Sequence, residues 1–204
     1  MLFAVGSTFF AVGSVPGYAS AVGAGADAAT FFCGSLFFTT AAYLQFTGAG
    51  RPDDALPTRH PVAWRPGSGT AWAGAIQFAG TLWFNVTTFA ATLRNLTVAQ
   101  QNRWIWRPDA LGSICFLVSS AIALAVVAAG TGWWRPGSRD WKAAALNMLG
   151  SVAFGVSAVA SYVVPDSGTV RNAKLVNLGT FVGAVCFLVA ALVVLPRRAP
   201  ARRS

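Results

Sequence analysis

The sequence predicts an all-α membrane protein, a six-transmembrane-helix bundle built from parallel two-helix repeats. The prediction rests on its composition, on its long apolar intervals and on a segment that recurs along the chain. The composition is 55% hydrophobic with a mean hydropathy of +0.56, and only 10% of the 204 residues are charged. So few charged side chains cannot cover the surface of a soluble domain of this size.

Six intervals lack charged side chains, and each contains a glycine followed by Ser, Thr or Ala. The hydrocarbon core of a bilayer is about 30 Å thick and needs about 20 mainly apolar residues in a helix. The intervals cover residues 1–26, 28–50, 66–93, 110–134, 143–165 and 175–196, and their glycines are Gly6, Gly34, Gly80, Gly112, Gly150 and Gly183. We therefore expect each interval to cross a membrane once.

The first interval is expected to be a transmembrane helix and not a cleaved export signal. Its apolar run begins at Met1 without a basic segment, and another apolar run follows directly. Pro16 is expected to lie within this helix and to kink it. Gly13 and Gly17 have the GxxxG spacing that favours close helix packing.

The later helices are related by an offset of about 70 residues. The segment Trp64–Ser68 recurs as Trp134–Ser138, and the same offset places Gln77 on Asn147. The stretch 112–118 matches 183–189 at an offset of 71. Because the repeated unit contains two helices, its copies point the same way across the membrane. The first two helices are interpreted as a third, diverged copy.

These boundaries divide the chain into five parts. Residues 1–50 hold helices one and two, and residues 51–70 form a basic loop. Helices three and four lie within 71–134, and helices five and six within 135–196. Residues 197–204 form a basic C-terminal tail.

The net charge is +9, from 15 Lys and Arg against 6 acidic residues. The basic residues fall in the short loops and the tail, where anionic headgroups explain them without a nucleic-acid partner. One side carries ten of them (Arg51, Arg59, Arg65, Arg135, Arg139, Lys142, Arg197, Arg198, Arg202 and Arg203) and the other five (Arg94, Arg103, Arg107, Arg171 and Lys174). This bias predicts that both termini are cytoplasmic.

Three stretches resemble YrhK-like membrane proteins: 106–117, 149–158 and 177–188. In that family a short basic and aromatic segment precedes a helix with a Gly-Ser pair, and a second helix follows. The resemblance covers roughly residues 64–196. It implies a multi-pass bacterial membrane protein and assigns no chemistry.

Small residues and amides are the candidate packing and polar sites. Lipid gives helices no hydrophobic reason to associate, so packing depends on close approach at small residues. We expect such contacts at Gly179 and at the six interval glycines, within one chain or, as the alternative, between chains. The amides of Gln77, Asn85, Asn147 and Asn177 are expected to be buried. Gln77 and Asn147 are further expected to occupy equivalent places and to hydrogen-bond to neighbouring helices, and a cavity shared by both would favour a solute pathway.

Aromatic and basic residues mark the expected membrane surfaces. The inner surface would hold Trp64, Arg65, Trp134 and Arg135, and the outer one Trp106, Arg107 and Asp109. The group around Trp106 has two interpretations. It is either a gate or clamp for anionic headgroups, or an ordinary helix start in which Pro108 and Asp109 suit the first turn.

No catalytic, metal or cofactor site is predicted. Cys33, Cys115 and Cys186 lie within expected helices, where we expect them to be buried, reduced and dispensable. His60 is the only histidine, which leaves too few ligands for a haem or zinc site. No acidic or basic residue is expected near a bilayer midplane, which argues against proton-coupled transport.

We therefore expect a non-enzymatic structural, lipid-interacting or partner-binding subunit of the bacterial inner membrane. Its expected partners are lipids and either a further membrane protein or a second copy of the chain. The alternative is a channel or carrier for a small neutral solute.

Overall fold

The computed structural model describes residues 1–48 and 67–195, which are helical apart from their connections. The elements are α1 (Leu2–Gly13), α2 (Tyr18–Val22), α3 (Ala24–Gly48), α4 (Gly69–Ala91), α5 (Val98–Gln101), the π-helical η1 (Asn102–Trp106), α6 (Arg107–Thr131), α7 (Arg139–Ala160) and α8 (Ala173–Val193). Within these ranges, the only β-type pairing joins Val163 to Val170. The fold is therefore all-α.

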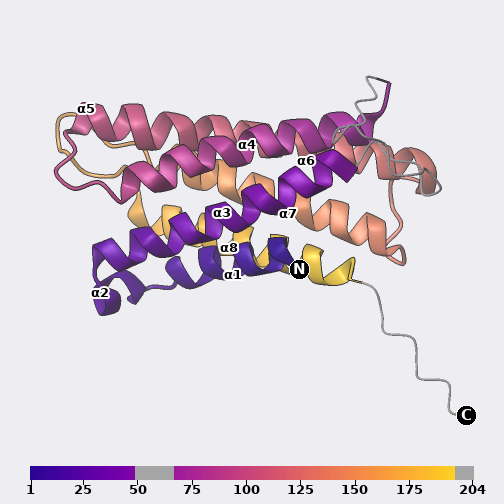
Figure 1. Cartoon of the computed structure of the whole chain (residues 1–204), viewed down its shortest axis with the longest axis horizontal. Coiled ribbons are helices and arrows are strands. Elements are labelled where there is room, and N and C mark those ends of the chain that lie inside the picture. The colour runs from indigo at the N-terminus through magenta and orange to yellow at the C-terminus, as the bar shows by residue number, and fades with distance from the viewer. Residues whose placement is uncertain (49–66, 196–204) are drawn as a thin grey trace, which may run out of the picture.

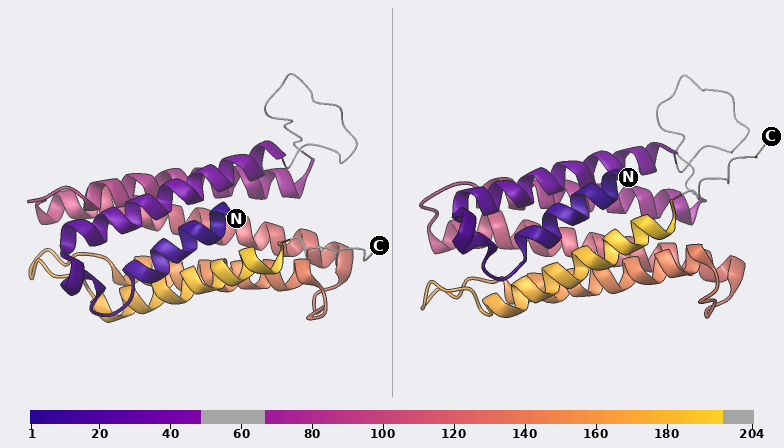
Figure 2. Two further views of the ribbon diagram at one scale, coloured as in Figure 1. Left: turned by 60° about the horizontal axis from the view of Figure 1, so that its bottom comes forward. Right: turned by 90° about the horizontal axis from the view of Figure 1, so that it is seen from below.

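Six main helices, α1, α3, α4, α6, α7 and α8, form a closed ring. Each packs against the next in this order, and α8 packs against α1 to complete the circuit. The helices run along the long axis of the molecule, as Figures 1 and 2 show. Every main helix therefore has one face toward the centre of the ring and another toward the outside.

The centre is filled by one phenylalanine from each main helix. These are Phe10, Phe38, Phe84, Phe116, Phe154 and Phe187, each only 5–6% exposed. Their rings meet mostly edge to face or tilted, as in the Phe10–Phe154 pair with centroids 6.0 Å apart. Such aromatic pairs add about 0.5–1.5 kcal/mol beyond the buried area. We call these six residues the phenylalanine cluster.

Each clustered phenylalanine lies four residues after one of the interval glycines, and thus on the same helical face. The glycines meet in pairs. A Cβ on Gly80 would lie 3.2 Å from the carbonyl oxygen of Gly112, and a Cβ on Gly150 would lie 3.1 Å from that of Gly183. On Gly6 it would lie 2.9 Å from the carbonyl oxygen of Gly34. Glycine is needed at these places because two backbones are in contact.

The two ends of the bundle differ in their side chains. The hairpin end contains residues 161–172, and the tryptophan end contains Trp133, Trp134 and Trp141. At the tryptophan end, α4 and α7 begin alike: the Ser68 side chain accepts from the Ala71 N–H, and the Ser138 side chain accepts from the Trp141 N–H, both at 3.3 Å. Such a cap satisfies a backbone donor that the first helical turn leaves free.

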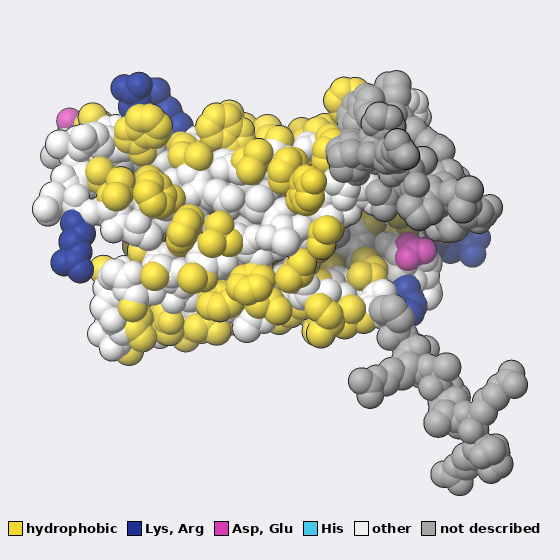
Figure 3. All heavy atoms as spheres, in the orientation of Figure 1, with side chains coloured by type: hydrophobic (Ala, Val, Ile, Leu, Met, Phe, Trp, Pro, Cys, Tyr) yellow, Lys and Arg dark blue, Asp and Glu magenta, His cyan; other side chains and the backbone are white. Residues whose placement is uncertain are grey.

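Within residues 1–48 and 67–195, three helical segments are long and apolar enough to cross a membrane: Val98–Gly130, Arg139–Ala160 and Ala173–Val193. α1 is apolar but shorter, and α3 and α4 are not among the three. α4 carries two amides, Gln77 and Asn85, which lower its hydropathy. Figure 3 shows Lys and Arg side chains near the ends of the long axis and hydrophobic side chains between them. The structure is thus compatible with a membrane-embedded protein.

The first expected helix is wrong in its extent. α1 ends at Gly13, and Pro16 lies in the connection to α2 instead of kinking a helix. Gly17 also lies outside α1, with φ of +89°, and a Cβ there would meet nothing within 4 Å. Because α1 ends at Gly13 and Gly17 is the residue that precedes α2, the two glycines do not lie on one helical face.

Pro108 and Asp109 lie in the first turn of α6, as one interpretation expected, but the helical chain does not begin there. The helical chain begins at Val98, where Thr97 and Gln100 form a reciprocal capping box. It continues through η1 into α6 without a break. Proline lacks an N–H and its ring clashes with the carbonyl four residues earlier, and the wider π turn that precedes Pro108 relieves both problems. Asp109 therefore lies more than two turns inside a helix.

Candidate functional site

A cavity of about 260 Å³ lies between the phenylalanine cluster and the tryptophan end. Three amide residues from different helices line it: Gln45 of α3, Gln77 of α4 and Asn147 of α7. The rest of the wall is mainly apolar and comes from α1, α7 and α8. We call this cavity the amide vestibule. It brings together Gln77 and Asn147, which the sequence placed at equivalent positions.

The vestibule amides have few protein partners. The Ser119 hydroxyl donates to the Ala73 carbonyl at 2.7 Å and lies 3.5 Å from Oε1 of Gln77. Within residues 1–48 and 67–195, the side chains of Gln45 and Asn147 make no hydrogen bond. The expectation that Asn147 bonds to a neighbouring helix is therefore wrong for its side chain. It fails because the amide faces the cavity, which leaves its donors and acceptor open to a polar molecule.

The other two candidate amides lie elsewhere. Asn85 is half-buried, and its Oδ1 accepts a hydrogen bond of 3.0 Å from the Thr39 hydroxyl across the α3–α4 seam. Asn177 is exposed, so its expected burial is wrong. It lies in the first turns of α8, on the face that points away from the ring, beside Leu178, which is also exposed.

The predicted surface residues take different roles. Trp134 is exposed and packs edge to face on Trp141, with centroids 5.1 Å apart, and Arg135 is exposed nearby. Arg107 is exposed at the hairpin end. Asp109 is half-buried, and its Oδ2 accepts a hydrogen bond of 3.2 Å from the Ser161 hydroxyl. Trp64 and Arg65 lie outside the described residues.

The predicted packing glycines lie at seams within the chain. Besides the three glycine pairs, Gly179 faces α7, where an added Cβ would lie 2.8 Å from the Ala153 carbonyl oxygen. Hydroxyl pairs accompany these contacts, such as Ser35 with Thr88 at 2.9 Å and Ser120 with Ser151 at 2.8 Å. The small residues therefore serve contacts inside one molecule.

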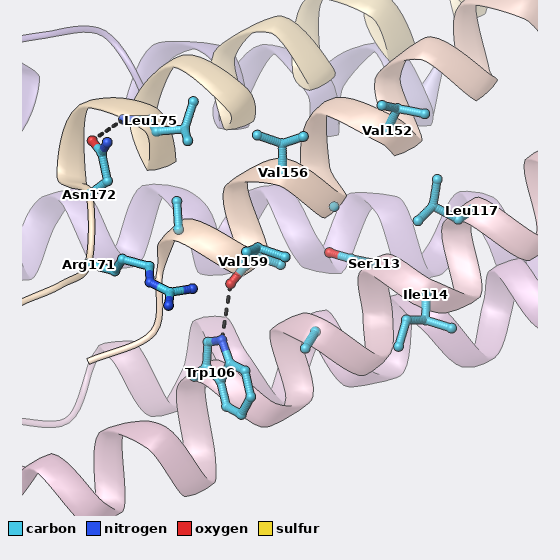
Figure 4. A pocket seen from close by; sticks show the side chains of 14 residues that line it. Trp106, Ser113, Ile114, Leu117, Val152, Val156, Val159, Arg171, Asn172 and Leu175 are labelled. Atoms are coloured by element: carbon cyan, nitrogen blue, oxygen red, sulfur yellow. Dashed lines mark hydrogen bonds between the residues drawn. The ribbon is translucent and has the colours of Figure 1, made fainter. Parts of the chain in front are cut away.

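A second candidate site is a groove on the outside of the ring, between α6 and α7 at the hairpin end. Its volume is about 710 Å³, and aliphatic side chains form most of its wall. Figure 4 shows Arg171 and Trp106 toward one end, and Leu117 and Val152 toward the other. The Trp106 Nε1 donates to the Ala158 carbonyl oxygen at 3.1 Å. We call this feature the lateral groove.

Sequence reasoning missed several residues of these sites. Gln45 carried the same signal as Gln77, an amide inside an apolar interval, and could have been included. Arg171 was only counted as a loop charge. Asn102 gave no signal, because its two hydrogen bonds reach Val163, which is distant in the sequence.

The cysteines are free, and they differ in exposure: Cys33 is exposed, Cys115 is half-buried and Cys186 is buried. The expected burial of Cys33 is wrong because this residue lies on the outer face of α3. In the described part of the chain, no three His, Cys, Asp or Glu side chains group as metal ligands.

Comparison with family models, curated proteins and solved structures gives no match. The resemblance to YrhK-like proteins therefore stays a prediction from the quoted motifs.

Proposed function

We propose that all six main helices lie in the bacterial inner membrane, as three parallel copies of a two-helix unit. Support comes from the recurring glycine pairs and from the phenylalanine four residues after each glycine. The closed ring also joins α1, α3 and α4 side by side with the three apolar segments. The outward residues of α3 and α4 include exposed apolar side chains such as Leu36, Leu44, Leu82 and Phe89.

In this membrane, the proposed role is that of a non-enzymatic structural, lipid-interacting or partner-binding subunit, with both termini cytoplasmic. The carrying observation is the phenylalanine cluster, which fills the axis of the ring with side chains only 5–6% exposed. A closely packed interior of this kind is rigid and holds few voids. The outer faces of the helices are then the surfaces through which the protein meets lipid, another protein or a second copy of the chain.

A second candidate function, a channel or carrier for a small neutral solute, is favoured by the amide vestibule. Gln77 and Asn147 line one cavity, and amides bind neutral polar molecules through both donor and acceptor atoms. The vestibule is closed at its inner end by the phenylalanine cluster, since Phe187 belongs to both. Transport would need the cluster to open, whereas the structural role needs no movement.

Solute flux into proteoliposomes distinguishes the two functions. Vesicles with purified protein are mixed with glycerol or urea, and swelling is followed by light scattering. The structural role predicts the same rate as in protein-free vesicles. A rate that rises with the amount of protein, and falls when Gln77→Leu and Asn147→Leu are combined, would overturn it in favour of the carrier. Phe154→Ala is the matched variant that loosens the cluster without touching an amide.

A further inference from the structure

The lateral groove is a cavity that the proposed role leaves unused. Several of its wall residues are well exposed: Ile114 (55%), Val152 (43%), Val156 (42%) and Val159 (62%). Together with Leu117 they form a continuous aliphatic wall contributed by α6 and α7. Grooves of this size, about 710 Å³, are in the range of sites that hold small organic ligands.

The groove exists because α7 has small side chains where α4 has large ones. At the offset of 70 residues, Gly155 corresponds to Asn85 and Val159 to Phe89. In the α3–α4 seam, Asn85 accepts from Thr39, and the Phe89 ring packs on Phe32 with centroids 5.8 Å apart. The Phe89 ring occupies space that stays open beside Val159, whereas beside Gly155 the space is taken by Leu117, which an added Cβ would approach to 3.3 Å.

Among the described residues that line the groove, Arg171 is the only cation, and it lies at the hairpin end. Figure 4 shows the Arg171 guanidinium directed toward Val159 and Trp106. In the described ranges, this guanidinium makes no ion pair and no hydrogen bond. The same end carries Arg94, Arg103, Arg107 and Lys174 besides Arg171, against Asp27, Asp109 and Asp166, so its net charge is positive. An anionic group is therefore the complement of the Arg171 guanidinium.

Arg171 is held in place by a short hairpin. Its N–H donates to the Tyr162 carbonyl oxygen at 2.9 Å, beside the pairing of Val163 with Val170. Asn102 fixes Val163 from both sides, donating to its carbonyl at 2.7 Å and accepting from its N–H at 3.0 Å. The backbone that carries the charge is thus preorganised, which lowers the entropic cost of binding.

The groove has the depth of one leaflet. From Trp106 to Leu117 the wall of α6 is roughly 16 Å long at helical rise, about half of a hydrocarbon core of about 30 Å. Its apolar end lies near the level of the phenylalanine cluster, because Leu117 follows Phe116. A ligand with an anionic head at Arg171 and one long aliphatic chain matches both the charge and the length.

We propose that the lateral groove binds an anionic phospholipid of the leaflet at the hairpin end, with its phosphate at Arg171 and one acyl chain along α6 and α7. This site rests on the membrane embedding proposed above and specifies which lipid chemistry is held and where.

Photocrosslinking tests the site with the full chain. The protein is reconstituted into phosphatidylcholine vesicles that contain phosphatidylglycerol with a diazirine in its acyl chain, illuminated, digested and mapped by mass spectrometry. The expected labels lie in residues 110–117 and 152–159. Arg171→Gln should lower this labelling about fivefold, the factor that corresponds to the loss of about 1 kcal/mol of headgroup attraction.

Two further variants separate shape from charge. Val159→Phe introduces the phenylalanine that α4 has at the equivalent position, Phe89. The added ring should fill part of the groove and lower the labelling several-fold. Lys174→Gln removes a charge at the same end without touching the wall and should change the labelling less than twofold. A diazirine phosphatidylcholine should label the groove several-fold less than phosphatidylglycerol does.

The outcomes are distinguishable. Equal labelling by both lipids, or labelling unchanged in Arg171→Gln and Val159→Phe, would overturn the site. Even labelling around all six helices would overturn the site and sustain the embedding. No labelling on any helix would overturn the embedding and the site together.

Discussion

Gly179 offers the sharpest test of how the ring is packed. A Cβ at this position would lie 2.8 Å from the Ala153 carbonyl oxygen, 3.0 Å from the Ser157 Cβ and 3.1 Å from the Ser157 nitrogen. Two of these three atoms belong to the α7 backbone and cannot rotate away. Gly179→Ala must therefore push α8 away from α7.

The magnitude follows from two opposing terms. Overpacking typically costs about 1–3 kcal/mol, and replacing a helical glycine by alanine gains up to about 1 kcal/mol. Gly130→Ala is the matched control, because it is also helical and a Cβ there meets nothing within 4 Å. Gly130 is the last residue but one of α6, so its helix gain is at most that of Gly179. The difference between the free energies of unfolding of the two variants is therefore a lower bound on the packing cost of about 1–3 kcal/mol.

Equilibrium unfolding in mixed micelles with increasing dodecyl sulfate, followed by circular dichroism, measures this difference. Gly183→Ala gives a second reading at the same seam, where the Cβ would lie 2.7 Å from the Phe154 ring and 3.0 Å from the Gly150 carbonyl oxygen. Gly179→Ala and Gly130→Ala of equal stability would refute the close approach of α7 and α8.

Three further predictions concern other parts of the molecule. Gln77→Leu should lower the free energy of unfolding by only about 0.6 kcal/mol, the average for a hydrogen bond between membrane helices. Asn147→Leu should not change it measurably in the same assay, since the Asn147 side chain faces the vestibule. A loss above about 1.7 kcal/mol in either variant would contradict these positions of the two amides. Asn102→Ala should cost about 1–3 kcal/mol by freeing two buried backbone groups and should speed amide hydrogen exchange in the 161–172 hairpin, and unchanged exchange there would count against the clamp. In a background without the native cysteines, an impermeant maleimide added to intact cells should modify Ser167→Cys but not Asp140→Cys, and the reverse pattern would invert the proposed topology.

Part of the fold could be read from local sequence. The absence of charge over long intervals predicts membrane-compatible helices, because hydration of a charged group is lost wherever the helix enters hydrocarbon. The recurring glycines predict places of close approach, since only glycine lets two backbones touch. The end of α1 was also readable, because Pro16 and Gly17 form a dipeptide that marks a turn, and the length of the apolar interval concealed it.

The candidate sites were less accessible. Gln77 and Asn147 were found by their offset, but the sequence did not show that Gln45 joins them from another helix. The lateral groove cannot be read from any local pattern. It depends on the sizes of side chains on two helices, α6 and α7, that meet only in the folded protein. Val159 marks this open space, which becomes visible only by comparison with Phe89, whose ring packs on Phe32 in the α3–α4 seam.

The sequence alone thus determined that the chain forms apolar helices and that a glycine lies at a close contact on each main helix, since these features depend on each residue's own solvation and size. Only the tertiary structure decided that α8 returns to α1 and closes a ring, that six phenylalanines meet at its centre, and that Arg171 lines a groove with no ion-pair partner among the described residues. These features depend on residues far apart in the chain meeting in space. Hydropathy and spacing carry no information about such meetings, because they describe one helix at a time.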